Sequence, residues 1–146
     1  MKKIQITKML LFILPLLVVA IAVSPSSVLV YDGQTTEYYS WLQPVSGTVT
    51  GWCAPVAALL NYVLFALAVV YGFMKKQWAI KVIRNVAAVA GCIAVLPNLI
   101  RTGTLVVPSV FGGIFLLVDA VVAHLLLKNP VEAKADKKAG KRLERR

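Results

Sequence analysis

The sequence predicts an all-α membrane protein: four transmembrane helices in an up-down antiparallel bundle, with the N- and C-termini cytoplasmic. Two observations predict this fold class. Apolar residues make up 59% of the 146 residues and charged residues only 15%, whereas soluble domains contain about 45–50% and about 25%. The apolar residues also gather in four long runs, each close to the ~20 residues that a helix needs to cross a bilayer.

The four spans are expected at about 9–30, 52–74, 82–100 and 105–127, within a transmembrane domain that covers residues 1–127. Each run is apolar on all faces, which favours helices over the alternating strands of ~10 residues found in membrane barrels. Pro55 and Pro108 are expected in the first turns of the second and fourth helices. The third helix, with Arg84 near its start, is expected to end at Pro97. Short connections between the later spans make consecutive helices antiparallel neighbours.

The first apolar run allows a second interpretation. Met1 to Lys8 resembles the positive start of a signal peptide, and Ala20-Ile21-Ala22 is a small-x-small cleavage site. Cleavage there leaves three spans and an N-terminus on the outside. Because the apolar run continues to Val30, which is long for a signal peptide, an uncleaved first span is favoured.

Positive charge predicts the orientation in the membrane. All but one of the 16 Lys and Arg residues lie before the first run, between the second and third runs, or after the fourth. The exception is Arg101, on the opposite side together with Asp32 and Glu37. Because Lys and Arg accumulate in cytoplasmic segments, both termini are expected inside. The short basic start suits a multi-pass protein of a bacterial cytoplasmic membrane.

Two polar segments flank the spans: an outer loop at 31–51 and a basic tail at 128–146. The loop has the Gly, Pro and Ser content of turns. Its aromatic residues and the one outer cation form a candidate outer-surface contact: Tyr38, Tyr39, Trp41 and Arg101. A plain interfacial anchor is the favoured role of Arg101, and binding of an anionic ligand is the alternative. The tail is expected to be flexible and to fix the topology, with contact to anionic lipid as the alternative.

Asp119 and Asn61 form the candidate intramembrane polar site. Asp119 lies ~13 Å from the cytoplasmic end of its span, too deep for its short side chain to reach water. An acid at that depth costs at least ~2.5–3.5 kcal/mol, so it is expected to face the bundle and to have a partner. Asn61 lies at a similar depth. The functional hypothesis is a proton or cation site, and the structural hypothesis is a carboxyl hydrogen-bonded to a neighbouring helix. His124 lies on a different face of the same helix and is expected to be an interfacial anchor.

Helix packing is expected to use small residues four apart, such as Ala87 and Gly91, which let helix backbones approach closely. A homo-oligomer interface is the alternative use of these pairs. The first span is rich in Leu, Val and Ile and lacks such pairs, so it is expected to be the most lipid-exposed helix. Cys53 and Cys92 differ in depth by ~10 Å or more, which argues against a disulfide between them.

The sequence contains no phosphate-binding glycine loop, no metal-ligand spacing and no catalytic Ser, His and Asp set, so no cofactor, metal or enzyme activity is predicted. Its clustered basic residues argue against nucleic acid as a partner. The favoured function is a small structural, accessory or interaction subunit, whose partners are the lipid bilayer and a membrane protein or a second copy. A transporter or channel component that uses Asp119 is the first alternative, and a membrane enzyme is the second.

Overall fold

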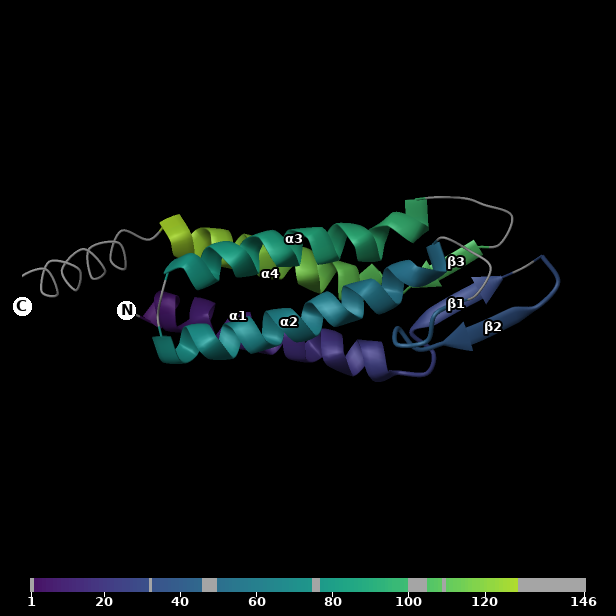
Figure 1. Cartoon of the computed structure of the whole chain (residues 1–146), viewed down its shortest axis with the longest axis horizontal. Coiled ribbons are helices and arrows are strands. Elements are labelled where there is room, and N and C mark those ends of the chain that lie inside the picture. Colours follow the sequence, from purple (N-terminus) through teal and green to yellow (C-terminus); the bar gives the residue numbers. More distant parts are fainter. Residues whose placement is uncertain are drawn as a thin grey trace, which may run out of the picture.

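A computed structural model describes residues 2–31, 33–45, 50–74, 77–99, 105–108 and 110–128. In chain order the elements are α1 (Lys2–Val23), β1 (Val28–Tyr31), β2 (Thr36–Tyr39), η1 (Thr50–Trp52), α2 (Cys53–Met74), α3 (Gln77–Leu99), β3 (Leu105–Pro108) and α4 (Val110–Lys128). The four α-helices run back and forth along the long axis, with the strands gathered at one end (Figure 1). That end is called the sheet end below, and the opposite end, where α1 begins and α4 finishes, the terminal end.

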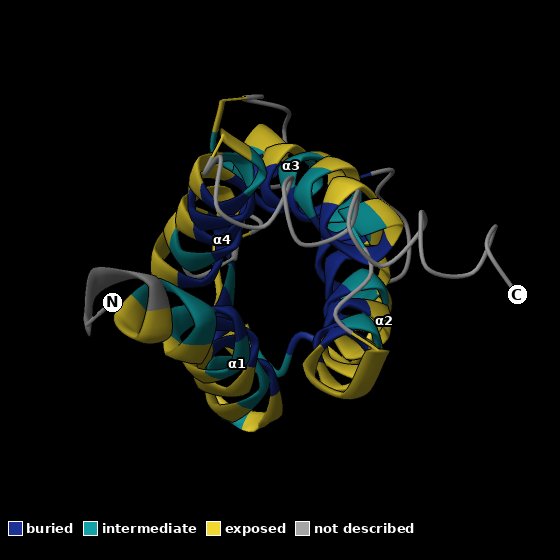
Figure 2. Cartoon of the chain, turned by 90° about the vertical axis from the view of Figure 1, so that its left-hand side faces the viewer, coloured by how far each residue is buried: buried dark blue, intermediate teal, exposed yellow. Residues whose placement is uncertain are grey.

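The four helices form a closed ring in which each helix packs against two others. The packed pairs are α1 with α2, α2 with α3, α3 with α4, and α4 with α1, and Figure 2 shows the ring along its axis. On α4, the buried positions Gly112, Leu116, Asp119, Ala123 and Leu126 alternate in steps of four and three residues. This spacing is typical of left-handed helical bundles, in which one stripe of every helix faces the axis.

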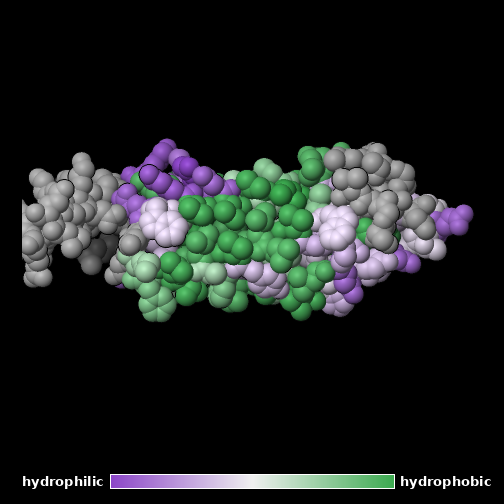
Figure 3. All heavy atoms as spheres, in the orientation of Figure 1, coloured by the Kyte–Doolittle hydropathy of each residue, from purple (hydrophilic) through white to green (hydrophobic). Residues whose placement is uncertain are grey.

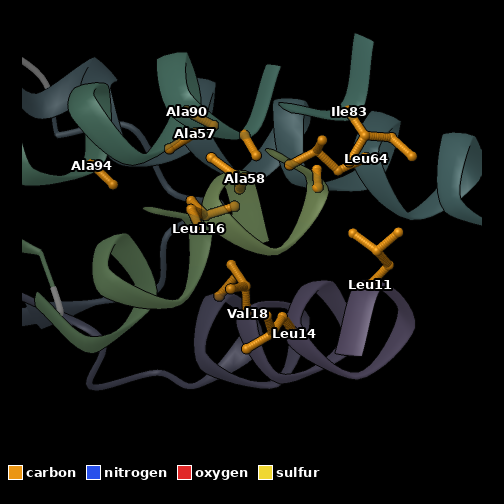
Figure 4. Packing of buried hydrophobic residues seen from close by; sticks show 14 of the residues in the cluster. Leu11, Leu14, Val18, Ala57, Ala58, Leu64, Ile83, Ala90, Ala94 and Leu116 are labelled. Atoms are coloured by element: carbon orange, nitrogen blue, oxygen red, sulfur yellow. The ribbon is translucent and has the colours of Figure 1, made fainter. Parts of the chain in front are cut away.

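The core between the helices combines branched side chains with alanines. Figure 4 shows leucine and valine side chains of α1 and α4 facing alanines of α2 and α3. Leu11, Val18 and Leu116 are fully buried, as are Ala57 and Ala90. Alternating large and small side chains lets helices approach closely and fill the space between them, which is how helices associate where lipid removes the hydrophobic driving force.

All four α-helices are long and apolar enough to cross a membrane. Their outward faces expose large apolar side chains, among them Leu59, Val63 and Val121. Figure 3 shows the resulting apolar belt between two more polar ends. The apolar part of α1 is the least buried of the four helices, with 28% of it buried against 44% for α4, which agrees with the expectation that the first span is the most exposed.

A three-stranded antiparallel sheet in the order β2-β1-β3 covers one end of the bundle. In the central strand, Val28 lies opposite Tyr39 of β2 on one side and opposite Pro108 of β3 on the other. Gly33, in the turn between β1 and β2, has a φ of 98°, a conformation that glycine adopts without steric cost. The sheet joins the α1–α2 connection to the α3–α4 connection.

The sheet corrects the expected bounds of two spans. The first helix covers Lys2–Val23 rather than 9–30, and the fourth begins at Val110 rather than 105. In each case the apolar run continues into a strand, Val28–Tyr31 or Leu105–Pro108, which hydropathy alone counts as membrane span. Pro108 therefore lies in β3 and not in the first turn of α4.

The third helix is longer than expected, and the second matches its expected range closely. α3 begins at Gln77 rather than at 82, and Pro97 lies inside it, two residues before its end at Leu99. Proline removes one backbone N–H donor and its ring crowds the carbonyl one turn earlier, and α3 ends two residues after Pro97. Pro55 lies in the first turn of α2, as expected.

Candidate functional site

Asp119 lies on the buried stripe of α4 and is fully buried, with 0% of its surface exposed. Its position agrees with the expectation that the acid faces the bundle. The expected partner is not found among the described residues, because neither carboxylate oxygen has a hydrogen-bond partner there. An unpaired carboxylate away from water is one of the most expensive groups that a membrane-embedded helix can carry.

Asn61 lies on the buried stripe of α2 and is 1% exposed. Its side-chain amide nitrogen donates a hydrogen bond to the main-chain oxygen of Pro15 on α1, at 3.0 Å. This bond fixes the amide orientation, because a flipped amide would bring its own oxygen against the Pro15 oxygen. The oxygen Oδ1 of Asn61 has no hydrogen-bond partner among the residues that the structure describes.

Asn61 and Asp119 lie at a similar depth in the bundle, counted along their helices. Asn61 is about 8 residues from the sheet end of α2 and Asp119 about 9 from that of α4, or ~12–13 Å at ~1.5 Å per residue. Pro15, joined to Asn61 by its hydrogen bond, is about 8 residues from the sheet end of α1. We call Pro15, Asn61 and Asp119 the central polar layer.

On α3 the central polar layer is bordered by small residues. A Cβ added to Gly91 would lie 2.7 Å from Leu117 Cδ2, and one added to Gly113 would lie 2.7 Å from Val95 Cγ2. These two contacts define the antiparallel register of α3 on α4, which brings the stretch 87–90 of α3 to the level of Asp119. Both end residues of that stretch are fully buried alanines, so α3 contributes no polar side chain to the layer.

No basic side chain that the structure describes is paired with Asp119. Arg84 lies nearer the terminal end of α3, where its Nε and Nη2 donate to Asn85 Oδ1 at 3.0 and 2.9 Å. His124 is half-buried and lies about 5 residues further along α4, or ~140° around the helix. The predicted separation of His124 from the face of Asp119 therefore follows from the helix geometry.

The aromatic residues of the expected outer-surface contact separate into exposed and buried positions. Tyr38 is 60% exposed, whereas Trp41 is 0% exposed. Tyr39 is half-buried; its hydroxyl donates to Glu37 Oε2, and this hydrogen bond raises the pKa of Tyr39 above its ordinary value of 10.0. Arg101, the fourth member of the set, lies outside the described residues, as does Asp32.

Trp41 forms part of the core rather than an outer surface, which corrects the expectation for this residue. A Cβ added to Gly112 would overlap the indole ring of Trp41, so the ring lies directly on the first turn of α4. Its main-chain N–H donates to the Ala22 oxygen at 3.1 Å, next to the end of α1. Trp41 thereby joins the α1–α2 connection to two helices and closes the bundle at the sheet end. A glycine pair near the start of an apolar run was the only sequence signal for this contact.

The cysteines are both unpaired in the structure, in agreement with the expectation that they form no disulfide. In the described part of the chain, no group of three or more His, Cys, Asp or Glu side chains could hold a metal ion. Among the described residues, buried side-chain atoms without a hydrogen-bond partner are most concentrated in the central polar layer, at Asn61 and Asp119.

Together these features define a class of protein: a four-helix chain with the length and hydropathy of a multi-pass membrane protein, a polar layer in its core and a small sheet at one end. Comparison with known proteins places it no more narrowly. No protein-family model, no curated protein and no solved structure matches the chain.

Proposed function

We propose that this chain is a non-catalytic accessory subunit of a membrane assembly, which binds a partner membrane protein through the sheet at its outer end. In this proposal both termini are cytoplasmic and the sheet lies outside the membrane. Lys8 and Lys81 belong to the terminal end, as the distribution of basic residues in cytoplasmic segments requires. The predicted basic tail lies outside the described residues from 129 onward, and the proposal keeps it cytoplasmic.

The observation that carries this proposal is the sheet itself. β1 is paired on both sides, whereas β2 pairs only with β1. Among the described residues, the other edge of β2 has no strand partner, and it lies beside the exposed side chains of Thr36, Glu37 and Tyr38. An open edge is a template for an added strand, and tyrosine is enriched at protein interfaces. The partner that fits is an extended segment of another membrane protein, pairing along β2.

The hydrophobic core supports an accessory role over transport. The buried polar residues that the structure describes are four: Ser27, Thr50, Asn61 and Asp119. Ser27 precedes β1 and Thr50 begins η1, both at the sheet end, so the central polar layer supplies the only two within the described α-helices. A transport pathway requires polar groups along its length, and a single layer does not provide them.

Site-specific crosslinking in intact cells tests this proposal. A photoreactive phenylalanine derivative is placed at Tyr38 and, as a matched control, at Tyr62. Both are exposed tyrosines, but Tyr62 lies on the membrane-spanning helix α2. We expect one discrete adduct from position 38, identified by mass spectrometry as a different membrane protein, and no such adduct from position 62. A crosslink to a second copy would replace the accessory role by a homo-oligomer. A chain that purifies alone with no adduct at position 38 would refute the proposal.

A further inference from the structure

The central polar layer contains three buried oxygen atoms without hydrogen-bond partners among the described residues: Oδ1 and Oδ2 of Asp119 and Oδ1 of Asn61. Both side chains lie on core-facing stripes at the same depth, and both are at least 99% buried. Packing alone does not account for these polar side chains. An apolar side chain of similar size would fill the same space without the cost of removing polar atoms from water. Three unsatisfied oxygens in one layer have the chemistry of a cation ligand set.

Among the side chains that the structure describes, no positive charge is paired with Asp119. Between residues 53 and 74, α2 contains no Asp, Glu, Lys, Arg or His. On α1, α3 and α4, the basic side chains that the structure describes are Lys8, Lys81, Arg84, His124 and Lys128. All of them lie nearer the terminal end than Asp119, and His124, about five residues further along α4, is ~7.5 Å from Asp119 along the helix axis. Glu37 lies in β2, beyond the sheet end of the helices.

The charge of the layer and the chemistry of its oxygen atoms decide which class of ligand it can bind. The layer contributes one carboxylate, so one positive charge neutralises it, whereas a divalent ion would keep an uncompensated charge away from water. Hard cations take oxygen ligands, which the carboxylate and the amide oxygen supply. The hydrogen bond from Asn61 to the Pro15 oxygen, 3.0 Å long, uses the amide nitrogen and leaves the oxygen Oδ1 free to act as the second ligand.

We propose that the central polar layer binds one monovalent cation, H⁺ or Na⁺, on the carboxylate of Asp119, with Oδ1 of Asn61 as a second oxygen ligand. This site is independent of the proposed partner at the sheet. Binding neutralises the one buried charge among the described residues and would tie α4 to α2 across the axis. The stability of the bundle then depends on the concentration of its cation, because a ligand that binds only the folded state stabilises it.

Infrared spectroscopy of the full chain in lipid nanodiscs tests the site. The carbonyl band of a protonated carboxyl is followed as wild type minus Asp119→Asn, with pH and Na⁺ varied and choline chloride holding the ionic strength constant. Loss of the band when Na⁺ is added at constant pH identifies Na⁺ exchanging for H⁺. Loss on raising the pH, with no effect of Na⁺, identifies a proton site. A band that changes with neither, or no band together with no effect of Na⁺ on the carboxylate bands, overturns the proposal.

Asn61→Leu separates the second ligand from the first. This variant keeps the carboxylate but removes the oxygen Oδ1, and we expect the concentration of Na⁺, or of H⁺, at half-conversion to rise about tenfold, the cost of one hydrogen bond or ligand contact. An unchanged midpoint would refute the role of Asn61. In case Asp119→Asn does not fold, the melting temperature of wild type in NaCl and in choline chloride, across the same pH range, gives a second measurement. A melting temperature independent of both Na⁺ and H⁺ would contradict binding.

Discussion

The close approach of α3 and α4 at Gly91 makes a quantitative prediction for Gly91→Ala. An ideal Cβ at this position would lie 2.7 Å from Leu117 Cδ2, 2.8 Å from Cγ and 3.2 Å from the Leu117 backbone nitrogen. The first two atoms move if the leucine side chain rotates, but the backbone nitrogen moves only with α4 itself. Overpacking of this kind costs about 1–3 kcal/mol, which opposes the gain in helix propensity from replacing a glycine.

Gly72→Ala on α2 is the matched control. Its Cβ would lie 3.0 Å from Phe12 Cζ, the tip of a ring, and the next nearest atoms are at 3.8 and 4.0 Å. Both substitutions replace a helical glycine, so both gain the same helix propensity, ~1 kcal/mol. The difference between the two variants isolates the packing of α3 on α4. We expect Gly91→Ala to be less stable than Gly72→Ala by about 1–3 kcal/mol.

Reversible unfolding in mixed micelles, with increasing sodium dodecyl sulfate and helix content followed by circular dichroism, measures both free energies. Adding Leu117→Ala to Gly91→Ala removes the two side-chain contacts and leaves the backbone contact, so we expect partial recovery and non-additive energies. Equal stability of Gly91→Ala and Gly72→Ala, or a fully additive double variant, would refute the contact between Gly91 and Leu117 as the point of closest approach.

Two further predictions concern the sheet end. Trp41 is 0% exposed, against 58% for Trp52 and 50% for Trp78, so among single-tryptophan variants only the one that keeps Trp41 should resist quenching by acrylamide. Trp41→Ala should lower the free energy of unfolding by about 3–5 kcal/mol. Quenching of Trp41 equal to that of Trp52 would contradict its burial. The hydrogen bond to Glu37 raises the pKa of Tyr39 above its ordinary value of 10.0. The neutral hydroxyl and its hydrogen bond are therefore fully present below pH 10.0 and are lost as the pH rises through the raised pKa. Glu37→Gln removes the negative charge beside the hydroxyl and should lower the pKa of Tyr39. The titration is followed as the ultraviolet absorbance of each protein minus that of its Tyr39→Phe variant. A titration midpoint of Tyr39 unchanged by Glu37→Gln would show that this hydrogen bond does not set the pKa.

Hydropathy was sufficient to predict four helices but not all of their ends. α2 follows its apolar run closely, because the run ends in polar residues on both sides. The first run extends across Ser24 and Pro25 into Val28–Tyr31, a strand whose residues are as apolar as those of the helix. Ser-Pro marks a turn, and β-branched and aromatic residues after it favour a strand. These local signals were present, but pairing between β1 and β3 joins residues about 75 positions apart, which periodicity does not report.

The central polar layer was partly predictable. The rise of a helix per residue gave the depths of Asp119 and Asn61, since both spans run in the same direction. The hydrogen bond from Asn61 to Pro15 was not predictable, because it depends on the register of α1 against α2. The burial of Trp41 has a similar origin. Its contact with Gly112 is set by how the α1–α2 connection lies over α4, which aromatic composition does not indicate.

The central claim is that the sheet lies outside the membrane while the terminal end faces the cytoplasm, and cysteine labelling in intact cells tests it most directly. In a background of Cys53→Ser and Cys92→Ala, single cysteines replace Thr36 of β2 and Lys81 of α3, both exposed. A membrane-impermeant maleimide should label Thr36→Cys in intact cells, and Lys81→Cys only after the cells are permeabilised. Labelling of Lys81→Cys in intact cells, or protection of Thr36→Cys until permeabilisation, would contradict this orientation.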